Sequence, residues 1–137
     1  MRFGFALVFA ALTLTACGSV GLDGSPSPSG PPALTFDLAV SEKDTAATLH
    51  TGQRLEVVLH AGPNMSNWAD MHSSDPSVLE AIVNPAATAA RGVTLAGYQA
   101  VAPGLAQISA TSSPICMPNM ACPMFIAVWQ VKVTVKG

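Results

Sequence analysis

The chain has 137 residues, of which 10% are charged, and its formal net charge is -2 at pH 7. This length allows one domain of ordinary size. So few charges exclude the dense basic surface that nucleic-acid binding needs, and no nucleic-acid partner is expected. The many Ala, Val, Thr, Ser, Pro and Gly residues favour an exported β domain over a cytosolic helical one.

The first residues have the pattern of an export signal. Met1 and Arg2 supply a positive charge, and residues 3–14 form an apolar run that is too short to span a bilayer. The following Leu14-Thr15-Ala16-Cys17 resembles the lipobox of bacterial lipoproteins. The resemblance implies that residues 1–16 are a signal peptide and that Cys17 carries a lipid anchor to a membrane of the cell envelope, on its extracytoplasmic face. The alternative is an ordinary signal peptide with a chance cysteine.

Residues 17–33 follow as a segment rich in Gly, Ser and Pro, including the run Ser25-Pro26-Ser27-Pro28-Ser29-Gly30. Such a composition buries too little apolar surface to offset the entropy of ordering it. We expect a disordered tether here, which starts at the lipidated cysteine and leads to a folded domain over residues 34–137.

From residue 34 onward, apolar and polar residues alternate in short runs that are separated by Gly, Pro, Asn and Asp. A period of two indicates half-buried strands, and the separating residues indicate turns. The runs cover residues 34–40, 54–60, 68–72, 78–83, 93–101, 105–111 and 129–136. About seven short strands and no long helix predict an all-β fold, an immunoglobulin-like antiparallel β-sandwich.

The alternation also predicts which side chains face the core. Residues 41–51 are polar and irregular and are expected to cross between the sheets, and residues 84–92 are expected to form a loop. Trp68 is expected to pack centrally, as a large residue often does in a small sandwich. The other predicted inward residues are Leu34, Phe36, Leu38, Val40, Leu55, Val57, Leu59, Tyr98, Ala100, Ala106, Ile108, Ala110, Trp129, Val131, Val133 and Val135.

Two cysteines, Cys116 and Cys122, are separated by five residues, directly before the last strand. In an exported protein a pair this close in sequence is expected to be oxidised, and five intervening residues meet disulfide geometry without gross strain. A disulfide between Cys116 and Cys122 is therefore predicted, in preference to a Cys–His catalytic site. No catalytic residues and no cofactor are expected, because His50, His60 and His72 are scattered and no nucleophile motif is present.

Two resemblances to known families cover the domain. The segment from Ala102 to Ala110, with Pro103-Gly104 before an alternating strand, resembles a strand entry of many bacterial immunoglobulin-like domains. The succession of residues 52–59, an Asn-containing loop, Trp68 and Pro103-Gly104 is similar to the chagasin family of cysteine-protease inhibitors, over about residues 49–135. Small actinobacterial-type lipoproteins of unassigned function are the closer likeness. The chagasin likeness implies a protein partner, a protease.

Two loops are the predicted partner-binding surface. In an immunoglobulin topology the loop after the second strand of the fold and the loop before the last strand emerge at the same end. We therefore expect a non-enzymatic module that binds a protein or an envelope component with these loops. The residues predicted to contact the partner are Asn64, Met65, Asn67, Trp68, Met117, Pro118, Asn119 and Met120.

Methionines are frequent near the same two loops, which suggests an alternative. Thioether and imidazole ligands suit Cu(I), so a copper-binding envelope protein is the second hypothesis. Its ligands would be Met65, Met71, His72, Met117 and Met120. The competing interpretation is that these side chains fill the core or form an adaptable apolar contact surface.

Overall fold

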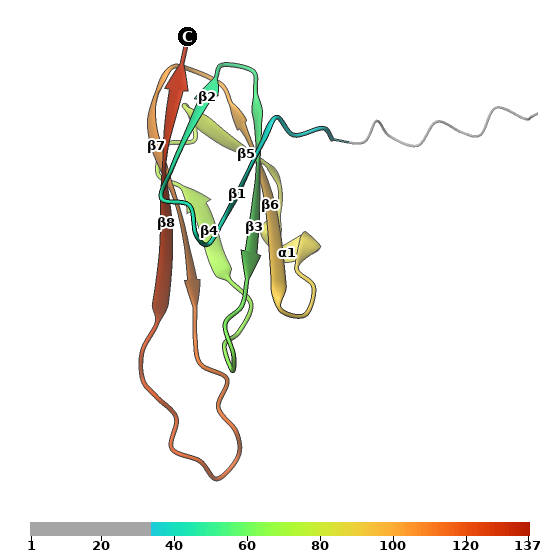
Figure 1. Ribbon diagram of the computed structural model, residues 1–137, viewed down its shortest axis with the longest axis vertical. Helices are drawn as coiled ribbons and strands as arrows, with labels where there is room; N and C mark the ends of the chain where they lie inside the picture. The colour runs from blue at the N-terminus through green and yellow to red at the C-terminus, as the bar shows by residue number, and fades with distance from the viewer. Residues whose placement is uncertain (1–33) are drawn as a thin grey trace, which may run out of the picture. The chain divides into compact units, whose positions relative to one another are not determined.

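The computed structural model describes residues 34–137, which form one compact unit (Figure 1). The predictions for the signal peptide, for Cys17 and for the tether lie outside the described residues. Within residues 34–137 there are eight strands and a single helical turn: β1 (Leu38–Ser41), β2 (Ala46–His50), β3 (Arg54–His60), β4 (Ala69–Ser73), β5 (Leu79–Val83), α1 (Pro85–Thr88), β6 (Val93–Ala100), β7 (Gly104–Ser112) and β8 (Ala127–Lys136).

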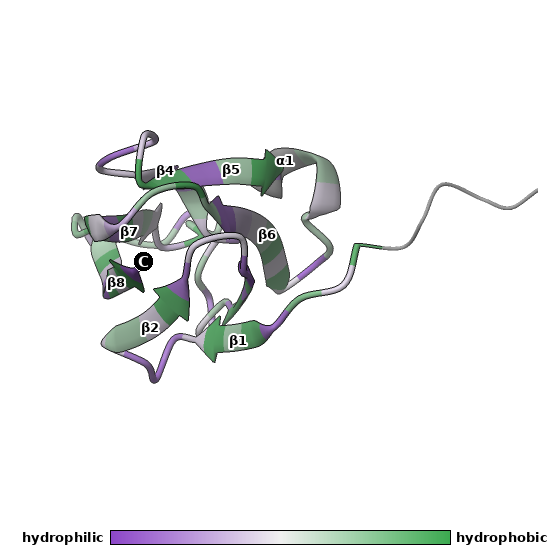
Figure 2. Cartoon of the chain, turned by 90° about the horizontal axis from the view of Figure 1, so that it is seen from above, coloured by the Kyte–Doolittle hydropathy of each residue, from purple (hydrophilic) through white to green (hydrophobic). Residues whose placement is uncertain are grey.

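The strands form two four-stranded sheets. The first sheet has the order β1-β3-β6-β5 and the second the order β2-β8-β7-β4. Viewed from above, the sheets lie in two layers (Figure 2). The predicted all-β, immunoglobulin-like sandwich is confirmed, with eight strands rather than about seven. The additional strand is β2, which lies inside the segment expected only to cross between the sheets.

The sequence predicted antiparallel strands, but two pairs of neighbouring strands are parallel. The edge strand β1 runs parallel to β3, and the edge strand β2 runs parallel to β8. The cause lies in the connection: β2 belongs to the second sheet but lies between β1 and β3 in the chain. The chain therefore reverses twice before β3, and β3 runs in the same direction as β1. All other neighbouring strands are antiparallel.

The core lies between the two sheets and follows the predicted alternation in the long strands. Leu55, Val57 and Leu59 of β3 are fully buried, and so are Val131 and Val133 of β8. Burying one such side chain contributes about 1.5–3 kcal/mol. The other inward residues predicted from β6, β7 and β8 are also buried: Tyr98, Ala100, Ala106, Ile108, Ala110, Trp129 and Val135.

The inward positions predicted for residues 34–40 are mostly wrong. Only Val40 is buried, because the strand begins at Leu38, and Leu34 and Leu38 are exposed. A bend at Asp37 ends the alternation before the strand starts. Phe36 instead lies against Gly97, where an added Cβ would stand 2.9 Å from the ring. Gly97 faces away from the core because its neighbours in β6 face inward, so Phe36 covers the outer face of the sheet.

Tyr98 makes the stability of this core sensitive to high pH. Burial raises the pKa of Tyr98 to about 12 from 10.0. The native state therefore keeps a proton that the unfolded chain loses, and this stability is fully present below pH 10 and lost as the pH rises toward 12. We expect a loss of about 2–3 kcal/mol relative to Tyr98→Phe across this window, from about 1.4 kcal/mol per pKa unit. Urea unfolding at several pH values measures it; parallel curves for both proteins would contradict it.

Candidate functional site

Three loops meet at one end of the sandwich. They are residues 61–68 between β3 and β4, residues 84–92 between β5 and β6, and residues 113–126 between β7 and β8. We call this end the loop pole; it lies at the bottom of Figure 1, where the β7–β8 loop projects farthest. The first and third of these loops are the two that the sequence predicted to emerge together.

Backbone hydrogen bonds join the β3–β4 loop to the β7–β8 loop. The N–H of Ser66 donates to the carbonyl of Ser113 at 2.7 Å, and the N–H of Ile115 donates to the carbonyl of Asn64 at 2.7 Å. The buried Ser112 hydroxyl donates to the Ser66 carbonyl at 2.7 Å. These bonds extend the order of β7 beyond its last residue, so the base of the β7–β8 loop is fixed against its neighbour.

Asn67 joins the β3–β4 loop to the β5–β6 loop. Its side-chain amide donates to the carbonyl of Ala90, and its side-chain oxygen accepts from the N–H of Gly92 at 2.9 Å. The adjacent Trp68 donates its indole N–H to the carbonyl of His60 at 2.9 Å and packs, partly buried, against the core. Both residues therefore hold the pole together, and the large central core residue is Trp129 rather than Trp68.

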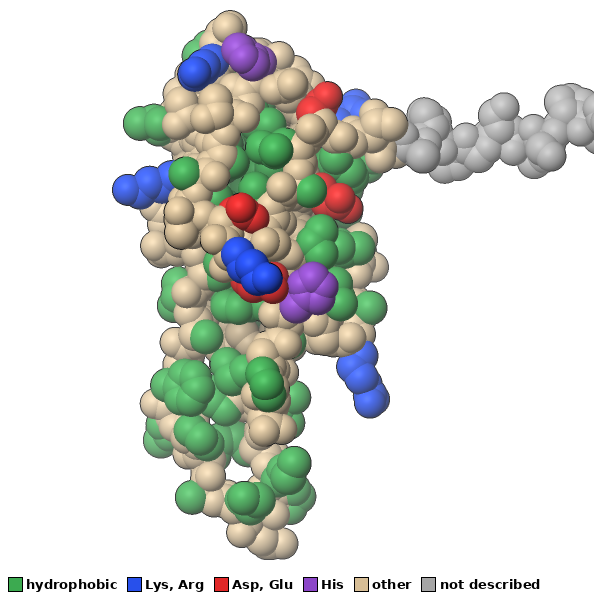
Figure 3. Space-filling model, in the orientation of Figure 1, with side chains coloured by type: hydrophobic (Ala, Val, Ile, Leu, Met, Phe, Trp, Pro, Cys, Tyr) green, Lys and Arg blue, Asp and Glu red, His purple; other side chains and the backbone are tan. Residues whose placement is uncertain are grey.

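The β7–β8 loop is apolar, uncharged and exposed. Every residue from Ile115 to Ile126 is exposed, and no charged residue occurs between Arg91 and Lys132. Figure 3 shows hydrophobic side chains over this projection, with no acidic or basic ones among them. The exposed fractions are 58% for Ile115, 59% for Met117, 69% for Met120, 100% for Met124, 54% for Phe125 and 64% for Ile126.

The predicted disulfide between Cys116 and Cys122 is confirmed, and the two Cα atoms are 5.3 Å apart. Closing so short a ring contributes about 2–3 kcal/mol by the chain-entropy argument and restricts the loop before anything binds. Asn119 lies at the tip with φ of 67°. Inside the bend is a hollow of about 250 Å³, which is lined by Asn64, Pro114, Ile115, Cys116, Met117, Met120, Ala121 and Pro123.

The residues predicted to bind a partner all lie at the loop pole, but they divide into two groups. Met65, Asn67 and Trp68 are partly buried, and the side chains of Asn67 and Trp68 support the loops. Asn64, Met117, Pro118, Asn119 and Met120 are exposed. The sequence reasoning omitted Ile115, Met124, Phe125 and Ile126, although a long apolar stretch without any charge was a signal for them.

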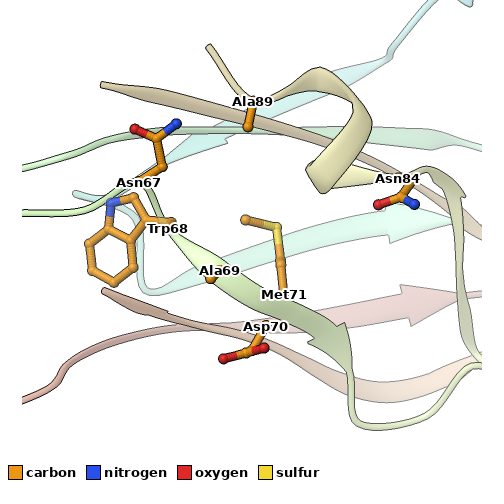
Figure 4. Close-up of a pocket in the computed structure, with 7 residues that line it drawn as sticks. All are labelled: Asn67, Trp68, Ala69, Asp70, Met71, Asn84 and Ala89. Carbon is orange, nitrogen blue, oxygen red and sulfur yellow. The ribbon is translucent and has the colours of Figure 1, made fainter. Parts of the chain in front are cut away.

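The five residues of the copper alternative are not brought together. Met71 packs against the core and lines a separate hollow of about 540 Å³ with Asn67, Trp68, Ala69, Asp70, Asn84 and Ala89 (Figure 4). His72 has partners for both ring nitrogens, at 2.7 Å from the carbonyl of Asp70 and 3.2 Å from the hydroxyl of Ser109. Only Met117 and Met120 line the same hollow. Within residues 34–137, no three His, Cys, Asp or Glu side chains gather as metal ligands would.

Comparisons with known proteins find similar solved structures but no matching family model or curated sequence. No protein-family model matches it, and no curated protein matches it in sequence. Among solved structures, it is similar to the cysteine protease inhibitor EhICP2 from Entamoeba histolytica, with a TM-score of 0.45 and 14% identity over 74% of this chain and 100% of that one. It is also similar to amebosin, with a TM-score of 0.44 and 16% identity over 72% of this chain and 97% of that one.

None of the helices in the described part of the chain has the length and apolar character of a membrane span.

Asn67→Ala is expected to loosen the loop pole. The substitution leaves the carbonyl of Ala90 and the N–H of Gly92 without their side-chain partner, which costs about 1–3 kcal/mol. Chemical denaturation measures the loss, and hydrogen exchange should become faster at the Gly92 amide. Asn67→Asp is the matched control, because its carboxylate still accepts from Gly92 and should retain most of that protection. Unchanged stability and unchanged exchange in the alanine variant would show that the link has no energetic role.

Proposed function

We propose that this domain is a non-enzymatic module that binds a partner protein through the loop pole. The observation that carries the proposal is the β7–β8 loop, in which every residue from Ile115 to Ile126 is exposed and none is charged. Contiguous apolar surface of this kind is rare on monomeric proteins except where something binds.

Rigidity supports the same conclusion. An exposed loop of this length would lose much conformational entropy on binding if it were free to move. The disulfide closes its tip, and the hydrogen bonds of Asn64 and Ser66 fix its base. Much of the conformational entropy of the loop is thus lost on folding rather than on binding, and apolar contacts with a partner contribute more fully to the binding free energy.

The shape of the loop favours a concave partner. A narrow projection with apolar side chains on its arms and tip fits a groove better than a flat surface. The sequence likeness to chagasin-like inhibitors makes the active-site groove of a papain-like cysteine protease the partner that we propose. The loop contains no Arg-Pro-Trp sequence of the kind those inhibitors carry, so Met117 and Met120 would provide the apolar contacts.

The proposed setting is the cell envelope. The lipobox-like segment ending at Cys17 supports a lipid anchor, and the Gly/Ser/Pro-rich segment after it supports a tether. A domain held in this way would present the loop pole on the extracytoplasmic side of a membrane.

Met120→Asp is expected to weaken binding strongly. If the purified protein inhibits papain at micromolar concentration, placing a carboxylate in the groove should raise the inhibition constant at least about tenfold, or about 1.4 kcal/mol. Met117→Asp should have a similar effect, because both side chains line the same hollow. Steady-state inhibition assays with a small peptide substrate measure the constants.

Leu105→Asp is the matched control. Leu105 is 73% exposed, which is close to Met120, but it lies near the start of β7, at the far end of that strand from the loop pole. The control should inhibit as the unaltered protein does. Equal losses in all three variants would argue against the loop pole, and no inhibition by the unaltered protein would remove the protease from the proposal.

Cys17→Ser tests the anchor. The substitution removes the thiol to which the lipid would be attached, so we expect the protein to leave the membrane fraction and appear in the soluble fraction. Fractionation of producing cells followed by immunoblotting measures the distribution. Undiminished membrane retention would contradict the proposed lipidation.

A further inference from the structure

Half of β8 forms an open edge of the second sheet. The neighbouring strand β2 pairs only with Lys132 to Lys136. The last hydrogen bond on the β2 side of β8 is donated by the N–H of Lys132 to the carbonyl of Thr45, at 3.0 Å. The chain that precedes Thr45 does not follow this edge. Residues 127–131 of β8 therefore have β7 on one side and no strand of the described chain on the other.

The backbone groups of Val128 and Gln130 point toward that open side. Backbone groups alternate in direction along a strand, so Val128 and Gln130 point the same way as Lys132, toward the β2 side. The hydrogen bonds of β7 are consistent with this direction. Gln107, which is opposite Lys132, makes its backbone hydrogen bonds to Ser74, on the side of β7 away from β8. Val128 and Gln130 thus present donors and acceptors that no described strand uses.

The open edge is apolar and continues into the loop. Residues 123–126 lead directly into β8, and Met124, Phe125, Ile126 and Val128 are all more than half exposed. No charged side chain interrupts this segment. Long apolar edges pair readily with another strand, and proteins usually protect them with charges, proline or bulges.

Two other edges of this sandwich do carry such protection. The pairing of β4 with β7 is irregular between Ala69 and His72, and Asp70 has φ of 52°. The pairing of β5 with β6 shifts register between Ala81 and Val83. The edge at β8 has no comparable irregularity, since its ladder with β7 is continuous from Ser112 opposite Ala127 to Gly104 opposite Val135. This edge is therefore open to pairing with another strand.

We propose that a second copy of this chain pairs with β8 along this edge, antiparallel and about a two-fold axis near Val128. Two identical edges supply each other's donors and acceptors, as an isologous interface requires. Because residues 92–131 hold no charged side chain, the two-fold axis brings no like charges together. For an axis at Val128, Val128 would lie opposite Val128 of the partner subunit and diagonal to Ile126 of the partner subunit, which favours cross-strand apolar contacts.

This dimer goes beyond the proposed function and is compatible with it. The paired segment is the second arm of the β7–β8 loop and the start of β8, whereas the tip from Met117 to Ala121 stays outside it. Because the two β8 strands run antiparallel, the two loop poles would point in opposite directions. One dimer would then offer two separate binding tips.

Site-specific disulfide cross-linking tests the dimer in the full chain. In an antiparallel pair, a residue opposite its own copy at a hydrogen-bonded position has its Cα about 5.5 Å from the other. This separation lies within the disulfide range. Ile126→Cys, Val128→Cys and Gln130→Cys are made separately in cells that produce the full chain, and oxidation is followed by non-reducing electrophoresis. We expect one of the three variants to form a band of twice the monomer mass. For a two-fold axis at Val128, that variant is Val128→Cys.

Leu105→Cys is the matched control, because it is exposed on the neighbouring strand but away from the open edge. It should cross-link at least about tenfold more slowly, since only random collisions bring two copies of it together. Adding Gln130→Lys to the Val128→Cys variant should suppress the dimer band, because each new cation would lie opposite the apolar Ile126 of the partner subunit. Retention of the Cys116–Cys122 disulfide in each variant shows that the added cysteine has not exchanged with it.

Two outcomes would overturn the proposal. Cross-linking at all three edge positions that is no faster than at Leu105→Cys would show that this edge is not paired with a second copy. An adduct of a different mass at Val128→Cys would show that another protein occupies the edge. Neither outcome bears on the papain assay, because that assay measures inhibition through the loop tip.

Discussion

The ladder between β7 and β8 is the constraint on which the rest of the structure depends. It covers all nine residues of β7 and orients β8 so that Trp129, Val131, Val133 and Val135 enter the core. The ladder ends where Ser112 faces Ala127, and beyond this pair the two chain segments separate into a loop. That loop has no core to enter, so its order comes from a disulfide at the tip and from hydrogen bonds to the β3–β4 loop at the base.

Sequence pattern predicted the parts of the fold in which burial alternates strictly. In the strands β3, β7 and β8 buried residues alternate with more exposed ones, so their period of two is visible without any structure. The strand β2 was missed because Leu49 is its one buried residue, and its remaining positions are small or polar. The parallel edge pairs could not be predicted either, since they follow from which sheet each strand joins.

The candidate site was predictable to the same degree. Loop positions follow from the topology of the sandwich, so the β3–β4 and β7–β8 loops could be placed together. The β5–β6 loop was predicted as a loop, but its place at the same pole was missed, because its link is one asparagine side chain whose partners lie 23 and 25 residues along the chain. The distinction between supporting and exposed residues also required coordinates, because Trp68 and Met120 are both large apolar residues of loops until burial separates them.

The exposed methionines make the surface chemistry of the loop pole dependent on redox conditions. Met117, Met120 and Met124 are each more than half exposed, so oxidants in the surroundings reach their sulfur atoms directly. Oxidation to the sulfoxide changes a flexible apolar side chain into a polar one and is reversed by dedicated reductases. The nearby disulfide is already oxidised and would not change in the same way. Three sulfoxides would thus turn an apolar projection into a polar one while leaving its backbone and its cross-link in place.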